Sequence, residues 1–208
     1  MKKKLLYGIL FIELFIIWTI LIQVIDVQAI GPNHTNVGFA TMNKWFHNLT
    51  GVHLNLYIIT DWLSILPFIV CICFGCLGLF QLIKRKSLFK VDTDLIILGI
   101  YYVLVIFIYL LFERIPINYR PILINGILEV SYPSSTTLLV LSVMPTLIVQ
   151  AKLRFKYFNL INIVTKLFII FMVMGRLISG VHWFTDIVGS ILLTIGLLNI
   201  YESLINYK

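Results

Sequence analysis

Long apolar stretches alternate with short polar or charged segments along the whole chain. They cover residues 5–29, 56–83, 94–112, 134–151, 159–179 and 182–203. Each is long enough to cross a bilayer core about 30 Å thick, which takes about 20 helical residues. Backbone N–H and C=O groups must be paired inside lipid, and the stretches are too long and continuous for barrel strands. The pattern therefore predicts an all-α, polytopic membrane protein with about six transmembrane helices.

Composition agrees with a membrane protein and excludes an ordinary soluble domain. Of the 208 residues, 60% are hydrophobic and 12% are charged, and the mean hydropathy is +1.01. The connecting segments are short, which predicts a single integral membrane domain over residues 1–208. The net charge of +7 does not indicate a nucleic-acid partner, because the basic residues gather in short clusters between the apolar stretches.

These basic clusters predict the orientation of the chain, since lysine and arginine are enriched in the cytoplasmic segments of membrane proteins. Eleven basic residues fall at the helix ends on the side of the N-terminus, four fall at the opposite ends, and Lys166 lies within a span. The eleven are Lys2, Lys3, Lys4, Lys84, Arg85, Lys86, Lys90, Lys152, Arg154, Lys156 and Lys208, and the four are Lys44, Arg114, Arg120 and Arg176. We expect a protein of the cell membrane with both termini in the cytoplasm and the loops at 30–55 and 113–133 outside.

Two of the apolar stretches have alternative interpretations. The first follows three lysines and ends at residues 27–29, which resemble a signal-peptide cleavage site, but it exceeds the about 7–15 apolar residues of such a peptide. An uncleaved helix is therefore favoured. Cys71, Cys73 and Cys76 form a C-x-C-x-x-C pattern, yet no histidine or carboxylate flanks them closely. We expect buried apolar thiols there and neither a metal site nor a disulfide framework.

Ionisable side chains within the apolar stretches mark either polar contacts or functional sites, because charge is costly in lipid. Glu13 and Lys166 both lie about one-third of the way in from the cytoplasmic side. An ion pair between them, or contact with a polar helix interface, is favoured over a transport site. Asp26 and Asp61 lie near the outer ends of their helices, where Asp61 could line an outward cavity.

The segment at 175–186 is unusually polar for a helix end in a membrane. It contains Arg176, His182 and Asp186, and the Ser-Gly pair at 179–180 marks a helix break. If a new helix begins near His182, the four-residue spacing places His182 and Asp186 on one face. A carboxylate can then fix the tautomer of the imidazole and make the other ring nitrogen a better nucleophile. Taken alone, the two residues could equally be solvated at the membrane interface.

Two further segments on the predicted outer side could bind an anion. Arg120 lies in the loop at 113–133, and its guanidinium offers a rigid fork of donors for phosphate oxygens. The sequence Ser-Tyr-Pro-Ser-Ser-Thr-Thr at 131–137 predicts a helix start, whose free N–H groups and dipole favour an anion. Each has a simpler interpretation, since a lone loop arginine is usually solvated and the hydroxyls could only cap the helix.

In this order, Arg-Pro in an outer loop, Tyr-Pro-Ser-Ser at a helix start and Arg-x5-His-x3-Asp at the next outward helix end resemble the type-2 phosphatidic acid phosphatase superfamily, relatives of the vanadium haloperoxidases. The resemblance covers residues 113–190, and the third motif is specific because three residue types match at fixed spacing. It implies a six-helix bundle that removes phosphate from a lipid phosphate or lipid diphosphate through a phosphohistidine. No metal ion and no cofactor would take part.

The resemblance also assigns roles to residues by position. His182 would be the nucleophile, Asp186 its orienting partner, and Arg120 and Arg176 the phosphate clamp. Further phosphate donors would come from the hydroxyl residues at the helix start, Ser134, Ser135 and Thr136. The expected partners are the lipid substrate and the bilayer, and the oligomeric state stays open.

Three positions depart from the family pattern. The first motif usually begins with lysine where this chain has Glu113, and the third usually opens with serine where it has Gly175. In the second motif Thr136 replaces the histidine that protonates the leaving group. A positioned general acid contributes about 10²–10⁴-fold to the rate. Its loss would harm least a substrate such as a polyprenyl diphosphate, which expels a phosphate monoester with a second pKa of about 6.

Three functions therefore follow from the sequence in order of preference. The first is a membrane phosphatase acting from the outer face, with hydrophobic walls below the site holding the lipid chain and with Glu113 as a possible acid if the cavity favours its neutral form. The second is an inactive family member that binds lipid phosphates. The third, a small transporter or scramblase-like protein, needs a polar path across the bilayer, whereas most polar residues of the helices lie at their outer ends.

Overall fold

The structure is a computed structural model that describes residues 2–154 and 156–205. Lys208, one of the basic residues assigned to the cytoplasmic side, lies outside these residues. Within the described chain the secondary structure is helical, in the order α1 (Lys2–Val24), η1 (Pro32–His34), α2 (Ala40–Thr50), α3 (Leu54–Leu63), α4 (Ile65–Arg85), η2 (Leu88–Lys90), α5 (Thr93–Arg114), α6 (Ser135–Arg154), α7 (Phe158–Ile178) and α8 (Phe184–Ile205).

Six segments of the described chain are long and apolar enough to cross a membrane, which confirms the predicted number of spans. Helices α3 and α4 together form one of them, Leu54–Arg85. The outer segment predicted as a loop at 30–55 differs from the prediction because it contains α2, which buries Ala40 and Asn43. Asp26 lies beyond the end of α1, and the N–H of Thr41 donates to its carboxylate at 2.7 Å, which lowers the pKa of Asp26.

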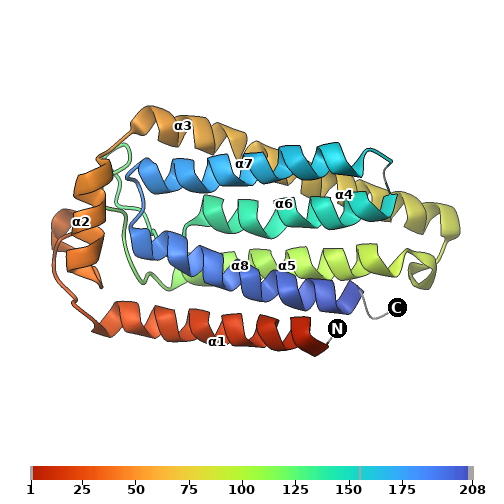
Figure 1. The fold of residues 1–208 in the computed structure, drawn as a ribbon, viewed down its shortest axis with the longest axis horizontal. Coiled ribbons are helices and arrows are strands. Elements are labelled where there is room, and N and C mark those ends of the chain that lie inside the picture. The colour runs from red at the N-terminus through yellow and green to blue at the C-terminus, as the bar shows by residue number, and fades with distance from the viewer. Residues whose placement is uncertain (1, 155, 206–208) are drawn as a thin grey trace.

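Helices α6 and α8 form the centre of the bundle, and the other spans surround them (Figure 1). About half of the α6 and α8 spans is buried, 56% and 50%, against 11–22% in the other four. Helix α1 packs along α8 over much of its length, and glycines permit the close approach. A Cβ on Gly8 would lie 2.6 Å from Ile200 Cγ1, and one on Gly196 would lie 2.7 Å from Ile12 Cδ1.

The basic clusters gather at one end of the bundle. The start of α1, the end of α8 and the α4–α5 and α6–α7 connections all lie there, and α2 lies at the opposite end (Figure 1). Ion pairs join the helices at the basic end, including Arg85–Asp92 at 2.8 Å and Arg154–Asp94. The hydrogen bonds from Arg85 and Gln81 lower the pKa of Asp92. The end that carries α2 is called the outer end below.

The predicted ion pair between Glu13 and Lys166 does not form, so that prediction is wrong. Helix α1 packs on α8, whereas α7 packs on α6 and α3, and the two helices lie on opposite flanks of the bundle (Figure 1). Both side chains are exposed on the outside of the bundle, and neither makes an ion pair or hydrogen bond within the described residues. Contact with a polar helix interface is therefore not observed either.

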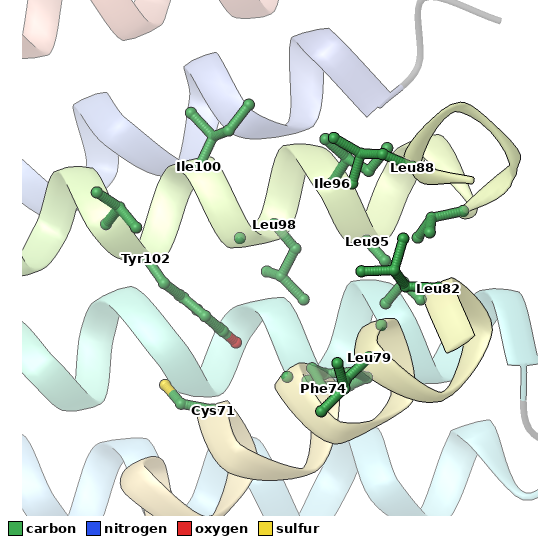
Figure 2. Close-up of a pocket in the computed structure, with 15 residues that line it drawn as sticks. Cys71, Phe74, Leu79, Leu82, Leu88, Leu95, Ile96, Leu98, Ile100 and Tyr102 are labelled. Carbon is green, nitrogen blue, oxygen red and sulfur yellow. The ribbon is translucent and has the colours of Figure 1, made fainter. Parts of the chain in front are cut away.

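An apolar groove of about 550 Å³ separates α4 from α5 in the half of the bundle nearer the basic end (Figure 2). Its walls include Phe74, Leu98 and Tyr102, and Cys71 lines its edge. The other two cysteines were predicted to be buried, but Cys73 and Cys76 are exposed on the surface of α4. Among the described residues no group of three or more His, Cys, Asp or Glu side chains could hold a metal ion.

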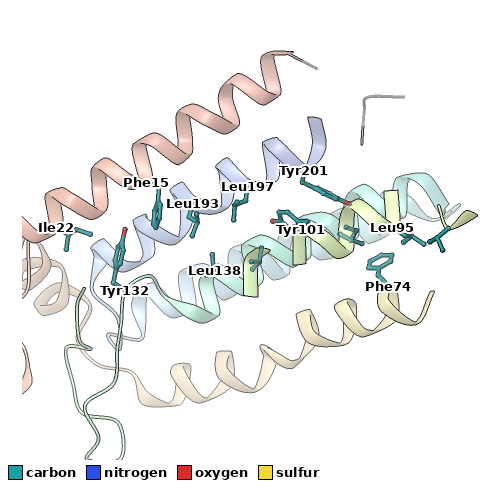
Figure 3. Packing of buried hydrophobic residues seen from close by; sticks show 13 residues of the cluster. Phe15, Ile22, Phe74, Leu95, Tyr101, Tyr132, Leu138, Leu193, Leu197 and Tyr201 are labelled. Atoms are coloured by element: carbon teal, nitrogen blue, oxygen red, sulfur yellow. The ribbon is translucent and has the colours of Figure 1, made fainter. Parts of the chain in front are cut away.

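The main hydrophobic core lies between α1, α8, α5 and α6 and is rich in aromatic rings (Figure 3). Tyr132, which precedes α6, stacks on Phe15 of α1 with ring centroids 6.2 Å apart. Its hydroxyl lies 2.7 Å from the hydroxyl of Thr19. These contacts hold the segment in front of α6 against α1, and this segment carries several of the predicted site residues.

Candidate functional site

The turn between α7 and α8 places His182 and Asp186 side by side. Gly180 has a φ of +70°, so the chain turns after the end of α7, and α8 begins at Phe184. Asp186 lies in the first turn of α8, where its Oδ2 accepts a hydrogen bond from the backbone N–H of Trp183 at 2.9 Å. Helix starts favour such a carboxylate because their N–H groups lack partners. His182 and Asp186 are both buried.

A serine hydroxyl links the imidazole to the carboxylate. His182 Nδ1 lies 3.8 Å from Asp186 Oδ2, which is too far for a direct hydrogen bond, and 3.0 Å from Ser131 Oγ. Ser131 Oγ donates its own proton to Asp186 Oδ2, so it accepts the proton of His182 Nδ1. Asn118 Nδ2 donates to Asp186 Oδ1 at 3.2 Å. This network fixes the tautomer in which His182 Nε2 carries a free lone pair.

The surroundings of His182 keep its ring neutral. Burial lowers the pKa of His182 from its ordinary value of 6.5 to about 4, and the positive charges of Arg120 and Arg176 lower it further against the opposing effect of Asp186. A neutral imidazole is the nucleophilic form. Its Nε2 is buried and makes no hydrogen bond within the described residues.

Arg120 reaches the site from the connection between α5 and α6. This connection folds back on itself, with hydrogen bonds from Arg120 N to Glu129 O at 3.0 Å and from Ser131 N to Asn118 O at 2.9 Å. The pairing brings Asn118, Arg120 and Ser131 to the same end of the connection. Arg120 Nε lies 3.0 Å from Glu129 Oε2 without hydrogen-bond alignment, and Nη1 is buried with no hydrogen-bond partner among the described residues.

Arg176 extends into the site from the last turn of α7. Its Nη2 contacts two groups, Asp61 Oδ1 at 2.9 Å and the hydroxyl of Thr136. Its Nε and Nη1 are buried and have no hydrogen-bond partner in the described chain. Tyr57, one turn before Asp61 on α3, lies against both guanidinium groups, 4.8 Å from Arg176 and 5.6 Å from Arg120. The two predicted clamp arginines therefore converge over one ring.

The start of α6 supplies the remaining polar groups. The hydroxyl of Ser134 is fully buried and donates to Thr137 Oγ1 at 3.0 Å, so it is already paired within the start of α6. Thr136 accepts a hydrogen bond from Arg176, and Ser135 is half-buried. The backbone N–H groups of the first turn have no partners within the helix and can bind an anion.

A cavity of about 440 Å³ opens beside this cluster between α4, α5 and α6. Its polar end is formed by Asp61, Ser64, Ser135 and Thr136, and its apolar wall by Phe68, Val105, Ile106, Leu110, Leu138 and Leu139, with Tyr109 between them. Glu113 lines a different and much smaller cavity, of about 20 Å³, together with Ser135 and Tyr132. No hydrogen bond or ion pair of the described residues joins Glu113 to the two arginines or to His182.

Sequence reasoning did not assign a role to several residues of this site. Ser131 is one more hydroxyl in a run that reads as a helix start, so nothing in the sequence distinguishes it. For Asp61 the sequence indicates only that it could line an outward cavity, and it does not distinguish Tyr57 from other aromatic residues of the span. The spacing of Tyr57 and Asp61, four residues apart on a helix, was an available signal that they share a face.

Comparisons with known proteins agree with this geometry. A family model described as the PAP2 superfamily matches residues 33–208. Among solved structures, the chain is similar to the crystal structure of the first transmembrane PAP2 type phosphatidylglycerolphosphate phosphatase from Bacillus subtilis. The TM-score is 0.66 at 15% sequence identity, and the match covers 96% of each chain. No curated protein sequence matches the chain.

Proposed function

Because the chain belongs to the PAP2 superfamily, a family of membrane lipid phosphatases, we propose that it hydrolyses a lipid phosphate or lipid diphosphate through a phosphohistidine on His182. The observation that carries the proposal is a set of buried nitrogens without hydrogen-bond partners in the described chain: His182 Nε2, Arg120 Nη1, and Nε and Nη1 of Arg176. Buried polar atoms left unpaired, whether arginine N–H donors or the lone pair of His182 Nε2, are costly unless a ligand pairs with them. Two guanidinium groups beside a neutral imidazole suit a phosphate group.

The chemistry follows from the positions of these groups. Arg120, Arg176 and the first-turn N–H groups of α6 hold the phosphate oxygens and balance the charge that develops on them. His182 Nε2 attacks phosphorus. The N–H at Nδ1 keeps its hydrogen bond to Ser131 Oγ, and Asp186 stabilises the positive charge of the ring through this hydroxyl. Water then attacks the phosphohistidine, releases phosphate and restores the neutral histidine.

The cavity beside Thr136 supports a lipid as the substrate. Its polar end adjoins the arginine clamp, and its wall is apolar over about 440 Å³. The groove in Figure 2 continues the same α4–α5 seam toward the basic end. A phosphate held by the arginines would therefore have its hydrocarbon chain along α4 and α5, within the span of the membrane.

The distribution of charge supports an extracytoplasmic site. The basic clusters lie at the end of the bundle opposite to His182, and cytoplasmic segments are the ones enriched in lysine and arginine. Both termini then lie in the cytoplasm, and the site opens to the outer leaflet.

Phosphate release from detergent-solubilised protein tests the proposal. The substrates are phosphatidic acid and a polyprenyl diphosphate, measured with a chelator present and with His182→Ala as the control. We expect release by the wild-type chain and none by the variant, since no other side chain described at the site offers an imidazole nitrogen for attack. Equal phosphate release by both proteins would contradict a phosphohistidine on His182.

One observation favours a second function, a binder of lipid phosphates without turnover. Thr136 stands where the family has its acid, and a threonine hydroxyl that accepts a hydrogen bond from Arg176 is a poor proton donor. In that case a folded wild-type chain binds both lipids and releases phosphate from neither.

A further inference from the structure

The proposed function leaves the proton of the leaving group without a donor. We propose that Asp61 is the general acid that protonates the leaving oxygen, in place of the histidine that Thr136 replaces. This inference rests on the proposed function and assigns a catalytic residue to a helix, α3, that lies outside the three sequence motifs.

The Asp61 carboxyl group lies close to Thr136, the residue that replaces the family's acid. Arg176 Nη2 contacts both Asp61 Oδ1, at 2.9 Å, and the hydroxyl of Thr136. Asp61 and Thr136 therefore contact the same nitrogen atom of Arg176 and lie close to each other. Asp61 approaches this position from α3, whereas Thr136 belongs to α6.

Asp61 also lies on the side of the site from which the lipid would enter. The bond that breaks joins phosphorus to the oxygen that carries the lipid, so the acid must stand where the phosphate site meets the lipid cavity. Asp61 lines that cavity together with Ser135 and Thr136, and its side chain is 56% exposed. Tyr109 is the other titratable residue of the lining, and it makes no hydrogen bond or ion pair with the arginines among the described residues. Among the described residues of the lining, Asp61 and Thr136 both contact the clamp, and Asp61 is the titratable one of the two.

A general acid must carry a proton when the bond to the lipid oxygen breaks. Without substrate, Asp61 pairs with Arg176, which is 99% buried and carries the only charge that the described structure places in contact with this carboxylate. Nε and Nη1 of Arg176 have no partner in the described chain, and a phosphate bound to them brings a second negative charge toward Asp61. A nearby negative charge favours the neutral form of a carboxyl group, which is the form that can donate a proton.

The proton balance closes over the two steps. In the first, the bond from His182 Nε2 to phosphorus forms, the bond from phosphorus to the lipid oxygen breaks, and Asp61 gives that oxygen its proton. In the second, water attacks phosphorus, its proton passes to the Asp61 carboxylate, and the bond from phosphorus to Nε2 breaks. The products are the lipid alcohol, or lipid monophosphate, and inorganic phosphate, and Asp61 ends protonated as it began.

The test compares substrates that differ in their need for an acid. Dodecyl phosphate expels an alkoxide and needs a proton, whereas p-nitrophenyl phosphate expels a stabilised phenolate and needs little help. For Asp61→Asn we expect kcat/KM to fall by about 10²–10⁴-fold on dodecyl phosphate and to change little on p-nitrophenyl phosphate. Asp61→Glu keeps a carboxyl group and is expected to hold the ratio of the two rates closer to that of the wild-type chain. Glu13→Gln, on the exposed surface of α1, is the control and should change neither rate, and Glu113→Gln tests the acid predicted from the sequence.

Each other outcome overturns the assignment. An equal fall on both substrates in Asp61→Asn would make Asp61 only a counter-ion of Arg176, and no fall on either would remove it from the reaction. A selective loss on dodecyl phosphate in Glu113→Gln would transfer the role to Glu113. His182-dependent release from p-nitrophenyl phosphate tests the proposed function separately, because it does not require the acid. Its absence in the wild-type chain would overturn both proposals.

Discussion

At the scale of single residues, the site depends on how His182 is held and which of its nitrogens is free. Ser131 is central because its hydroxyl is the only group observed between the ring and Asp186 within the described residues. A direct contact from Asp186 would orient the ring equally well in principle, but the observed separation of 3.8 Å leaves that task to the serine. Ser131 is therefore a positioning residue for the nucleophile.

Removing this hydroxyl should slow the chemical step without weakening binding. We expect Ser131→Ala to lower kcat by about tenfold to hundredfold, because a buried polar group left without a partner costs about 1–3 kcal/mol, and to leave KM nearly unchanged. Ser131→Thr keeps the hydroxyl and should recover most of the rate. Steady-state kinetics on a lipid phosphate measure both constants.

Ser142→Ala is a suitable control, because Ser142 Oγ is buried on α6 without a hydrogen-bond partner in the described chain and its loss should be neutral. A rise in KM with kcat unchanged in Ser131→Ala would contradict the positioning role.

The buried ring of His182 should stay neutral far below the ordinary range of histidine. Its pKa of about 4 predicts that the ¹³C-labelled imidazole signal of His182 does not titrate between pH 8 and pH 5, measured by NMR in detergent. The signal is assigned by its absence in His182→Ala. In the unfolded chain the ring takes up a proton near pH 6.5, so the unfolded state binds more protons in this window, and stability falls as the pH drops from about 6.5 toward 4. A midpoint near 6.5 in the folded protein would show that the ring is solvated.

At the scale of elements, the turn between α7 and α8 decides whether Arg176 and His182 face the same site. Gly180 has a φ of +70°, and a Cβ there would lie 2.1 Å from the carbonyl oxygen of Gly51. The same turn is tied to the start of α3 by a hydrogen bond from His53 N to Ser179 O at 3.0 Å. Glycine is required here for both its backbone conformation and its lack of a side chain.

Gly180→Ala should therefore lower both stability and activity. The positive φ alone costs about 1–3 kcal/mol, and the contact with Gly51 forces the turn to move. Gly126→Ala separates the two effects, because Gly126 has a φ of +77° with nothing within 4 Å of an added Cβ. We expect a clear fall in the thermal unfolding temperature and loss of phosphate release for Gly180→Ala, and a smaller fall with activity retained for Gly126→Ala. Equal behaviour of the two variants would mean that the contact with Gly51 does not matter.

At the scale of the whole molecule, the two ends of the bundle have opposite character. One carries the basic clusters, and the other carries α2, the folded connection that holds Arg120, and the start of α8 (Figure 1). This polarity is the basis for an extracytoplasmic site, and it can be tested without any assay of activity.

Single cysteines at exposed positions report the orientation. Ile127 lies in the connection at the outer end and is 62% exposed, and Phe89 lies at the basic end and is 96% exposed. We expect a membrane-impermeant maleimide to label Ile127→Cys in intact cells, and Phe89→Cys only after the cells are permeabilised. The chain with its own Cys71, Cys73 and Cys76, all within a span, gives the background. The reverse pattern would place the site on the cytoplasmic side.

The helical class, the six spans and the proximity of His182 to Asp186 follow from the sequence alone. Hydropathy and spacing are local properties, and a span of about 20 apolar residues in lipid has no alternative to a helix. Arg176 stands out as a charged residue at an apolar helix end, and Arg120 is assigned through the family resemblance of the Arg-Pro pair in the loop at 113–133. The role of Glu113 as a possible acid remains a prediction, and the rates of the Glu113→Gln and Asp61→Asn variants distinguish it from Asp61.

The packing of the helices in three dimensions selects which side chains meet. It placed Ser131 between the ring and Asp186, brought Asp61 and Thr136 to one nitrogen of Arg176, and separated Glu13 from Lys166. The sequence could not fix these contacts, because spans that are apolar on nearly every side do not reveal which face meets which neighbour. That choice depends on close packing between helices far apart in the chain, such as α1 against α8 and α3 against α7.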